Sequence, residues 1–310
     1  MSRLVLISSI GIGSWQTGAY FERKKFQQMF SDFDCISKKH FFKPGFPLMG
    51  TVSAATAFSP APIQDKNVTA NRIGQIMKYG FPGFDNIRSY DDFCLSYDRR
   101  NRVAHWVFEH LTAESVKHND AVDRSKSDFK PDESVHKFFR SENTDYKGSG
   151  FDRGHLAAAG NHKQNQKYCD QTFYLTNMAP QVGKGFNRDS WNRLERHVRK
   201  LTKAYPNVYC CTGPLYLPKK ESDGKLYVKY QVIGANSVAV PTHFYKIVVM
   251  ETADNKLEME AYVMPNQVID DETPLKLFQV PPETIERAAG LLFFDKIQRQ
   301  QLSKINGKSI

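Results

Sequence analysis

Apolar and polar residues alternate in several stretches between residues 93 and 264, a pattern that predicts β-strands. The first two strands, over 93–97 and 104–108, are expected to form a hairpin through a turn at 98–101. A third strand is predicted over 173–178. A C-terminal meander is predicted from four further strands, over 208–212, 227–233, 244–250 and 257–264.

Helical periodicity is clearest over residues 190–204. Trp191, Leu194, Val198 and Leu201 recur at spacings of three and four, so they share one face of a helix that Pro206 helps to end. Residues 282–304 also have helical character. Because helices interrupt the strands without regular βαβ alternation, we expect an α+β (mixed α/β) fold with a central antiparallel-rich sheet flanked by helices.

The N-terminal part differs in composition from the rest of the chain. No acidic residue precedes Glu22, serines are frequent, and a basic cluster follows at 23–25. This composition is typical of a mitochondrial targeting segment. A secretory signal and a membrane anchor are the alternatives, although the apolar run at 4–7 is short against the roughly 20 residues of a membrane span. No later segment has the apolar length to cross a bilayer.

Residues 46–69 are rich in Pro, Ala, Ser and Thr and carry almost no charge, as in an extended linker. We therefore expect three parts: an N-terminal targeting or anchor segment at 1–45, the linker at 46–69, and one large domain at 70–310. No internal repeat is present.

The chain has 310 residues, of which 40% are apolar and 13% aromatic, so it can fill a core and global disorder is excluded. Its 43 basic and 33 acidic residues give a formal charge of +10. This surplus favours polyanionic partners, either nucleic acid or an anionic membrane surface. The five cysteines show no zinc-site spacing and are interpreted as reduced thiols without chemistry.

Candidate chemistry begins at 152–155, which reads Asp-Arg-Gly-His. Hydrolysis of a phosphodiester needs a base near neutrality, and imidazole has an ordinary pKa of about 6.5. It also needs positive charge beside the reacting phosphate. On an extended segment Arg153 and His155 point to the same face, while Gly154 leaves the opposite face open for close packing.

A second candidate set lies at the start of the 190–204 helix. If the helix extends back to Asn187, the side chains of Asn187 and Glu195 can face one cavity. An asparagine carbonyl is a neutral, hard oxygen ligand that suits Mg²⁺, and Glu195 could hold one of the ion's waters. The structural alternatives are a helix cap for Asn187 and a solvated charge for Glu195.

Together these residues resemble a known family, the DNA/RNA non-specific ββα-metal nucleases, and in particular their endonuclease G type. The resemblance covers roughly residues 70–295. It depends on an ordered series of motifs, namely 79–82, 95–100, 106–107, 152–155, 176–181, 187–195 and 211–216. An exonuclease-type relative is similar to a lesser degree, because its signature typically begins with serine where this chain has Asp152.

The resemblance implies roles for individual residues. His155 matches the general base and Arg153 the phosphate-stabilising arginine of the signature. Asn187 matches the only direct protein ligand of the catalytic Mg²⁺ (or Mn²⁺), and Glu195 the acid that holds metal-bound water. Arg124, in the shorter motif 123–125, matches a second phosphate-stabilising arginine, and Asn177 matches a polar residue that supports the site.

The resemblance also implies a fold with a ββα-metal finger, in which a β-hairpin and a helix grip the metal. It implies an endonuclease that cuts double- and single-stranded DNA and RNA, forms homodimers and can be subject to a proteinaceous inhibitor. A mitochondrial location is implied, in the intermembrane space or at the inner membrane, with release to the nucleus during apoptotic DNA fragmentation. The rival interpretations are a catalytically inert, basic nucleic-acid-binding module on the same scaffold and a membrane-anchored structural protein.

Overall fold

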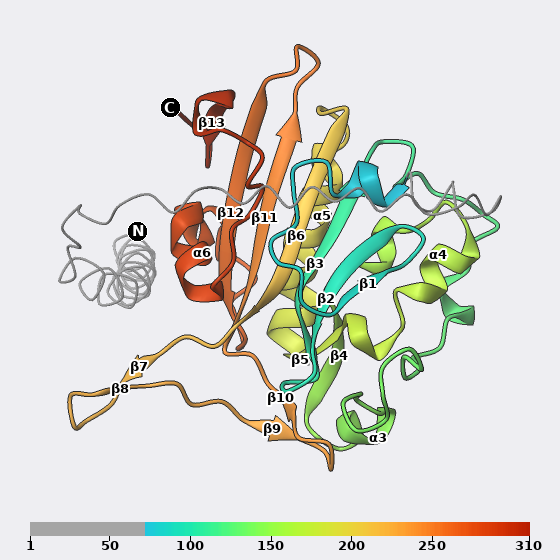
Figure 1. Cartoon of the computed structure of the whole chain (residues 1–310), viewed down its shortest axis with the longest axis vertical. Helices are drawn as coiled ribbons and strands as arrows, with labels where there is room; N and C mark the ends of the chain where they lie inside the picture. Colours follow the sequence, from blue (N-terminus) through green and yellow to red (C-terminus); the bar gives the residue numbers. More distant parts are fainter. Residues whose placement is uncertain (1–71) are drawn as a thin grey trace, which may run out of the picture. The chain divides into compact units, whose positions relative to one another are not determined.

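The fold is described from a computed structural model that covers residues 72–310 (Figure 1). The predicted targeting segment at 1–45 and the predicted linker at 46–69 lie outside the described residues. Among the helices of residues 72–310, none combines the length and apolarity that a membrane span requires.

An eight-stranded sheet forms the centre of the domain (Figure 1). Its strands are antiparallel to their neighbours, except that β12 and β13 run parallel. The expected α+β class with an antiparallel-rich sheet is therefore confirmed. In sheet order the strands are β1 (Ile87–Ser89), β2 (Phe93–Asp98), β3 (Val103–Leu111), β6 (Asn207–Leu215), β11 (His243–Glu251), β12 (Leu257–Pro265), β13 (Leu302–Ile305) and β14 (Lys308–Ser309).

Alternation along the strands divides their side chains between two buried faces. On β3, Phe108 packs against Phe294 at a ring-centroid distance of 5.1 Å, whereas its neighbour Val107 joins the core cluster that contains Trp191. On β11, Tyr245 packs against Phe293 at 5.1 Å, whereas Phe244 belongs to the Trp191 cluster. Both faces are covered, which explains why the central strands are buried at almost every position.

The elements that contain most of the candidate site residues pack on the face of the sheet that contacts Trp191. These are the two-stranded sheet of β4 (Phe151–His155) and β5 (Met178–Val182), the segment η4 (Gly183–Trp191), which becomes helical after a kink at Lys184 and Gly185, and α5 (Asn192–Leu201). Figure 1 shows α5 along the sheet beside β6. Trp191 and Leu194 are fully buried, and Trp191 packs against Phe244 at 5.6 Å, so the predicted anchoring face of this helix is confirmed.

Short elements complete residues 72–310. Besides the helical residues 72–76, the helical ones are η1 (Arg124–Lys126), α3 (Asn143–Tyr146), η2 (Ala159–Asn161), α4 (Gln166–Gln171), η3 (Leu175–Asn177), η5 (Leu275–Phe278), α6 (Pro282–Ala289) and η6 (Arg299–Gln301). The strands outside the main sheet and the β4–β5 pair are β7 (Lys219–Lys220), β8 (Leu226–Tyr227), β9 (Val232–Ile233) and β10 (Val238–Ala239).

The strand predicted over 173–178 is wrong. Residues Leu175–Asn177 form a 3₁₀ turn, and the strand begins only at Met178. The buried side chain of Asn177 explains the difference, because it bonds to the backbone of Ala157 and to the carbonyl of Thr172. Such side-chain bonds compete with an extended ladder.

The strand predicted over 227–233 is also wrong as one element. Only its two ends are strands, in β8 and β9, and Val228 and Tyr230 between them are 50% and 38% exposed. This stretch belongs to an arm that leaves the main sheet (Figure 1), so residues 227–232 are exposed and only Ile233, at its end, joins the core. At the C-terminus, α-helix covers only the first part of 282–304, because Gly290 ends α6 in the left-handed conformation (φ 68°), and a 3₁₀ turn, η6, follows at Arg299–Gln301.

Candidate active site

The β4–β5 pair presents the signature residues. In its antiparallel register Arg153 lies opposite Pro180, and His155 opposite Met178. A Cβ atom on Gly154 would lie 2.1 Å from Cδ of the buried Gln181, so the two strands need a glycine here. The close packing expected on the back of Gly154 is confirmed, and it leaves Arg153 and His155 to face a cavity on the other side.

That cavity has a volume of about 800 Å³ and collects side chains from five separate segments. Its polar lining includes most of the predicted site, from η1, β4, η4 and α5. The charged or polar residues at its centre are Arg124, Asp152, Arg153, His155, Asn187, Arg188, Glu195 and Arg199. The sequence-predicted residues are thus brought together, with one exception: Asn177 is buried beneath the site and holds the backbone at Ala157 instead.

His155 is held between two aromatic rings. The ring of Phe173 meets it edge-on at 4.7 Å, and that of Phe129 lies at 5.7 Å. The imidazole is 8% exposed, and its Nε2 is buried without a hydrogen-bond partner among residues 72–310. Burial, followed by the nearby charges of Arg124 and His162, lowers the pKa of His155 to about 3. At neutral pH the imidazole is therefore neutral, with an unprotonated ring nitrogen, and it is a weaker base than a free imidazole.

Two arginines flank this histidine. The Arg153 guanidinium lies 4.1 Å from the Phe129 ring centroid and donates to Oδ1 of Asn143 at 2.7 Å. The Arg124 guanidinium lies 5.8 Å from the Phe173 ring centroid. Neither forms an ion pair with a carboxylate of the described domain, so both leave positive charge for an anionic ligand.

Asn187 is held by a neighbouring carboxylate. Its Nδ2 donates to Oδ2 of Asp152 at 2.9 Å, and Asp152 also accepts two bonds from Arg188, at 2.8 and 2.6 Å. These partners hold the pKa of Asp152 below its usual value, Arg188 contributing most. Because a carboxylate only accepts hydrogen bonds, the amide nitrogen must face Asp152. The carbonyl oxygen Oδ1 of Asn187 is thereby left for a ligand in the cavity.

Glu195 follows two turns later on the same side of the helix. Burial raises its pKa, while Lys246 and Arg199 act in the opposite direction. Lys246 is itself 1% exposed, donates to Thr212 and lies 5.0 Å from the Trp191 ring centroid. The interpretation of Glu195 as an ordinary solvated charge is therefore wrong, since it lines the cavity and its charge is partly desolvated.

Arg199 and Asp152 are among the cavity residues to which the sequence analysis gave no role. Arg199 lies four residues after Glu195, a spacing that places both on one helix face and could have identified it. Its Nη1 donates to Oδ1 of Asn161 at 3.0 Å, and Nδ2 of Asn161 donates to the buried Glu109 at 2.7 Å. Asp152 belongs to the 152–155 signature, but the sequence suggested no role for it. Its hydrogen bond with Asn187 joins residues 35 positions apart, so a local pattern could not predict it.

The side chains that line the cavity are suited to bind a divalent cation through a small number of protein ligands. The Asn187 carbonyl supplies one hard oxygen, and Glu195 supplies a carboxylate in the same cavity. Within residues 72–310, no group of three or more His, Cys, Asp or Glu residues is arranged to enclose a metal ion. Such a donor set suits a hydrated ion that substrate phosphate completes, rather than one in a protein cage.

Comparisons with known proteins agree with this site. The sequence model of the DNA/RNA non-specific endonuclease family matches residues 73–300. Mitochondrial endonuclease G of Caenorhabditis elegans is 54% identical over 256 residues, which are 83% of this chain and 83% of that protein. The human protein of the same name is 54% identical over 224 residues, 72% of this chain and 74% of that protein.

A solved structure is similar as well. It is the crystal structure of an EndoG/EndoGI complex, described as showing the mechanism of EndoG inhibition, and its matching chain is 75% identical. The TM-score is 0.76, and the match covers 77% of this chain and 97% of the other. The relatives' names confirm the mitochondrial location predicted from residues 1–45.

The family consists of metal-dependent nucleases that act on nucleic acid. The match extends over more than two thirds of the chain and includes the cavity that holds His155, Asn187 and Glu195. This chain is therefore a hydrolase of the DNA/RNA non-specific endonuclease family, and it belongs to the endonuclease G branch of that family.

Proposed function

We propose that the chain is a sugar-non-specific endonuclease, dependent on Mg²⁺ or Mn²⁺, that hydrolyses DNA and RNA to 5′-phosphate and 3′-hydroxyl ends. One observation supports this above all: His155 and Asn187, from segments 32 residues apart, line the same cavity. A base and a hard oxygen ligand can then act on one phosphodiester.

In this proposal His155 removes a proton from an attacking water molecule. Its Nε2 is inaccessible to water, so Nδ1 receives the proton. The lowered pKa of His155 keeps the imidazole neutral beforehand, and the negative phosphate that enters the cavity stabilises the imidazolium that forms. Because the nucleophile comes from solvent, no 2′-hydroxyl is needed, and DNA and RNA both serve.

The remaining residues bind and orient. Arg153 and Arg124 stabilise the negative charge that grows on the non-bridging phosphate oxygens. Asn187 would hold the cation and Glu195 would orient a water molecule beside it. When bound, the cation supplies charge neutralisation at the phosphate and the leaving 3′ oxygen. Asn177 supports the site indirectly, by fixing the backbone two residues beyond His155.

The proposed setting is the mitochondrial intermembrane space or the inner-membrane surface, with release to the nucleus and a role in apoptotic DNA fragmentation and mitochondrial nucleic-acid metabolism. Homodimerisation and control by a protein inhibitor are part of the same proposal. The related EndoG was solved as a complex with EndoGI, which supports the second of these.

Nicking of a supercoiled plasmid, with Mg²⁺ and with EDTA, tests the proposal. We expect cleavage that EDTA abolishes, complete loss in His155→Ala, and loss of two or more orders of magnitude in Asn187→Ala. His118→Ala is the matched control, because that side chain is 75% exposed and outside the cavity. DNA binding without cleavage by the unaltered protein would instead support an inert binding module.

A further inference from the structure

A second surface, outside the cavity, combines exposed aromatic rings with arginine and lysine. Phe138 and Phe139 are 65% and 37% exposed. Arg99 lies 5.7 Å from the Phe139 ring centroid, and Lys137 lies 5.7 Å from that of Phe138. We call this set, together with Arg100, the aromatic surface.

The backbone holds these rings outward. The carbonyl of Phe138 accepts a bond from Arg102 at 3.2 Å, and that of Phe139 accepts one from the Tyr97 hydroxyl at 3.0 Å. These bonds fix residues 138–139 to the β2–β3 hairpin. A large apolar ring held in water by a fixed backbone gains by contact with a flat apolar partner.

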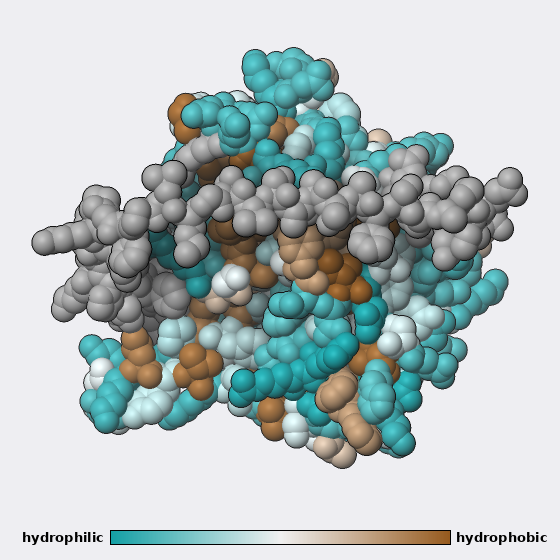
Figure 2. All heavy atoms as spheres, in the orientation of Figure 1, coloured by the Kyte–Doolittle hydropathy of each residue, from teal (hydrophilic) through white to brown (hydrophobic). Residues whose placement is uncertain are grey.

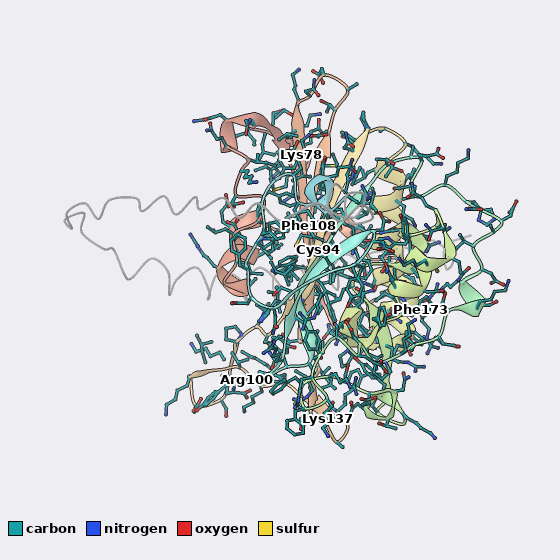
Figure 3. The ribbon with its side chains drawn as sticks, turned by 45° about the vertical axis from the view of Figure 1, so that its right-hand side comes forward. Lys78, Cys94, Arg100, Phe108, Lys137 and Phe173 are labelled. Atoms are coloured by element: carbon teal, nitrogen blue, oxygen red, sulfur yellow. The ribbon has the colours of Figure 1, made fainter. Side chains whose placement is uncertain are left out.

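The charges of the aromatic surface are free to meet a polyanion. The hairpin turn reads Arg-Arg-Asn-Arg over 99–102, and 136–140 reads His-Lys-Phe-Phe-Arg, with no acidic residue in either segment. Arg99, Arg100 and Lys137 form no ion pair with any carboxylate of the described domain. Arg100 and Lys137 lie toward the same lower end of the molecule in Figure 3. Apolar residues set among hydrophilic ones are visible at that end in Figure 2.

A short stretch of chain connects the aromatic surface to the catalytic cavity. Four residues after Phe139 the chain enters α3, whose Asn143 and Tyr146 line the cavity. Asn143 in turn accepts a hydrogen bond from Arg153. A nucleic-acid strand bound at the cavity therefore has a chemically suitable path along this side.

We infer that the aromatic surface binds an unpaired strand of the nucleic-acid substrate beyond the scissile phosphate. Bases stack on Phe138 and Phe139, while Arg99, Arg100 and Lys137 pair with phosphates. Paired bases in a duplex cannot offer their faces to these rings, so the surface favours single-stranded substrate. This inference rests on the proposed nuclease function and adds a substrate preference to it.

Binding measured in EDTA tests the inference without cleavage. Fluorescence anisotropy would compare the affinity of the unaltered protein and of F138A/F139A for a labelled single strand of about 16 nucleotides. We expect about tenfold weaker binding in the variant, and a change below about twofold for a duplex or for a strand of about four nucleotides. F138W/F139W should restore affinity, and Leu292→Ala, at a 65% exposed position elsewhere, is the control.

Arg100→Ala should lower the slope of log affinity against log salt for the long strand by about one phosphate contact. Equal affinity of F138A/F139A and the unaltered protein for the long strand would overturn the inference while leaving nuclease function intact. A protein that neither binds nor cuts nucleic acid would refute the proposed function itself. If F138A/F139A changed the oligomeric state in size-exclusion chromatography, the surface would be a contact between copies, and the inference would be wrong.

Discussion

The amide nitrogen of Asn187 donates a 2.9 Å hydrogen bond to the carboxylate of Asp152. The first residue of the 152–155 signature thus orients a residue on a helix 35 positions later. Arg188 binds both oxygens of the same carboxylate and keeps it ionised. The signature therefore places the proposed base, the proposed phosphate-binding arginine and the group that orients the proposed metal ligand on one short strand.

Replacement of Asp152 by Asn should weaken metal binding. An amide at 152 can present either its oxygen or its nitrogen, so the Asn187 carbonyl would no longer be held toward the cavity. We expect about tenfold to 100-fold lower affinity for Mn²⁺, measured by titration calorimetry without nucleic acid. Arg188→Gln, which retains the Asp152–Asn187 bond, should have the smaller effect. Equal Mn²⁺ affinity in Asp152→Asn and the unaltered protein would contradict this role.

A methyl group at Gly154 should destabilise the β4–β5 pair. Its Cβ would lie within 2.5 Å of three atoms of the buried Gln181 side chain. Overpacking of this kind typically costs about 1–3 kcal/mol of unfolding free energy, measurable by urea denaturation. The double variant G154A/Q181A should recover part of that loss. If Gly154→Ala lowered the unfolding free energy equally with Gln181 present and in a Gln181→Ala background, a steric clash with Gln181 would be excluded as the cause.

Much of the fold followed from local pattern. The β2–β3 hairpin, the strands near 208, 244 and 257, and the buried face of α5 all depend on alternation or helical spacing that a core enforces. The two wrong strands failed for opposite reasons. Asn177 diverts 175–177 by its own side-chain bonds, whereas 227–232 alternate on an exposed arm outside the main sheet.

Sequence motifs identified the residues of the candidate site whose chemical type suggests a role. His155, Arg153, Asn187 and Glu195 each have a residue type and spacing that suggest a role, and all line the cavity. The contacts that orient these side chains, such as the Asn187–Asp152 hydrogen bond, join residues far apart in the sequence and cannot be predicted from local spacing. The effect of burial on a pKa cannot be predicted from local sequence either. A free imidazole has a pKa of about 6.5, whereas desolvation lowers the pKa of His155 to about 3.

Loss of Asn161 should lower turnover through Arg199. Asn161 links the Arg199 guanidinium to the buried carboxylate of Glu109, so its removal frees the arginine to leave the cavity. We expect Asn161→Ala to reduce kcat about tenfold, measured with a short oligonucleotide below the melting temperature of the variant. In an Arg199→Ala background the same change should have little additional effect. Fully additive losses would show that Asn161 acts independently of Arg199.

His162 should make stability fall at alkaline pH. This fully buried imidazole lies between Asp92, at 2.7 Å, and Glu109, at 3.1 Å. The two carboxylates outweigh desolvation and raise its pKa to about 9, above the ordinary value of 6.5. A raised folded-state pKa means that the folded protein binds the proton more tightly than the unfolded chain. The stabilisation is then complete below pH about 6.5 and is lost as pH rises through about 9.

The size of this effect can be measured against a variant that does not titrate. A shift from 6.5 to about 9 corresponds to a contribution on the order of 3 kcal/mol. The unfolding free energy from urea denaturation should therefore decline more steeply between pH 6.5 and 9 in the unaltered protein than in His162→Gln. All other titrating groups are common to both proteins, so the difference in slope isolates His162. Parallel pH profiles would mean that the imidazole is already neutral between its two carboxylates, and this role of His162 would then be wrong.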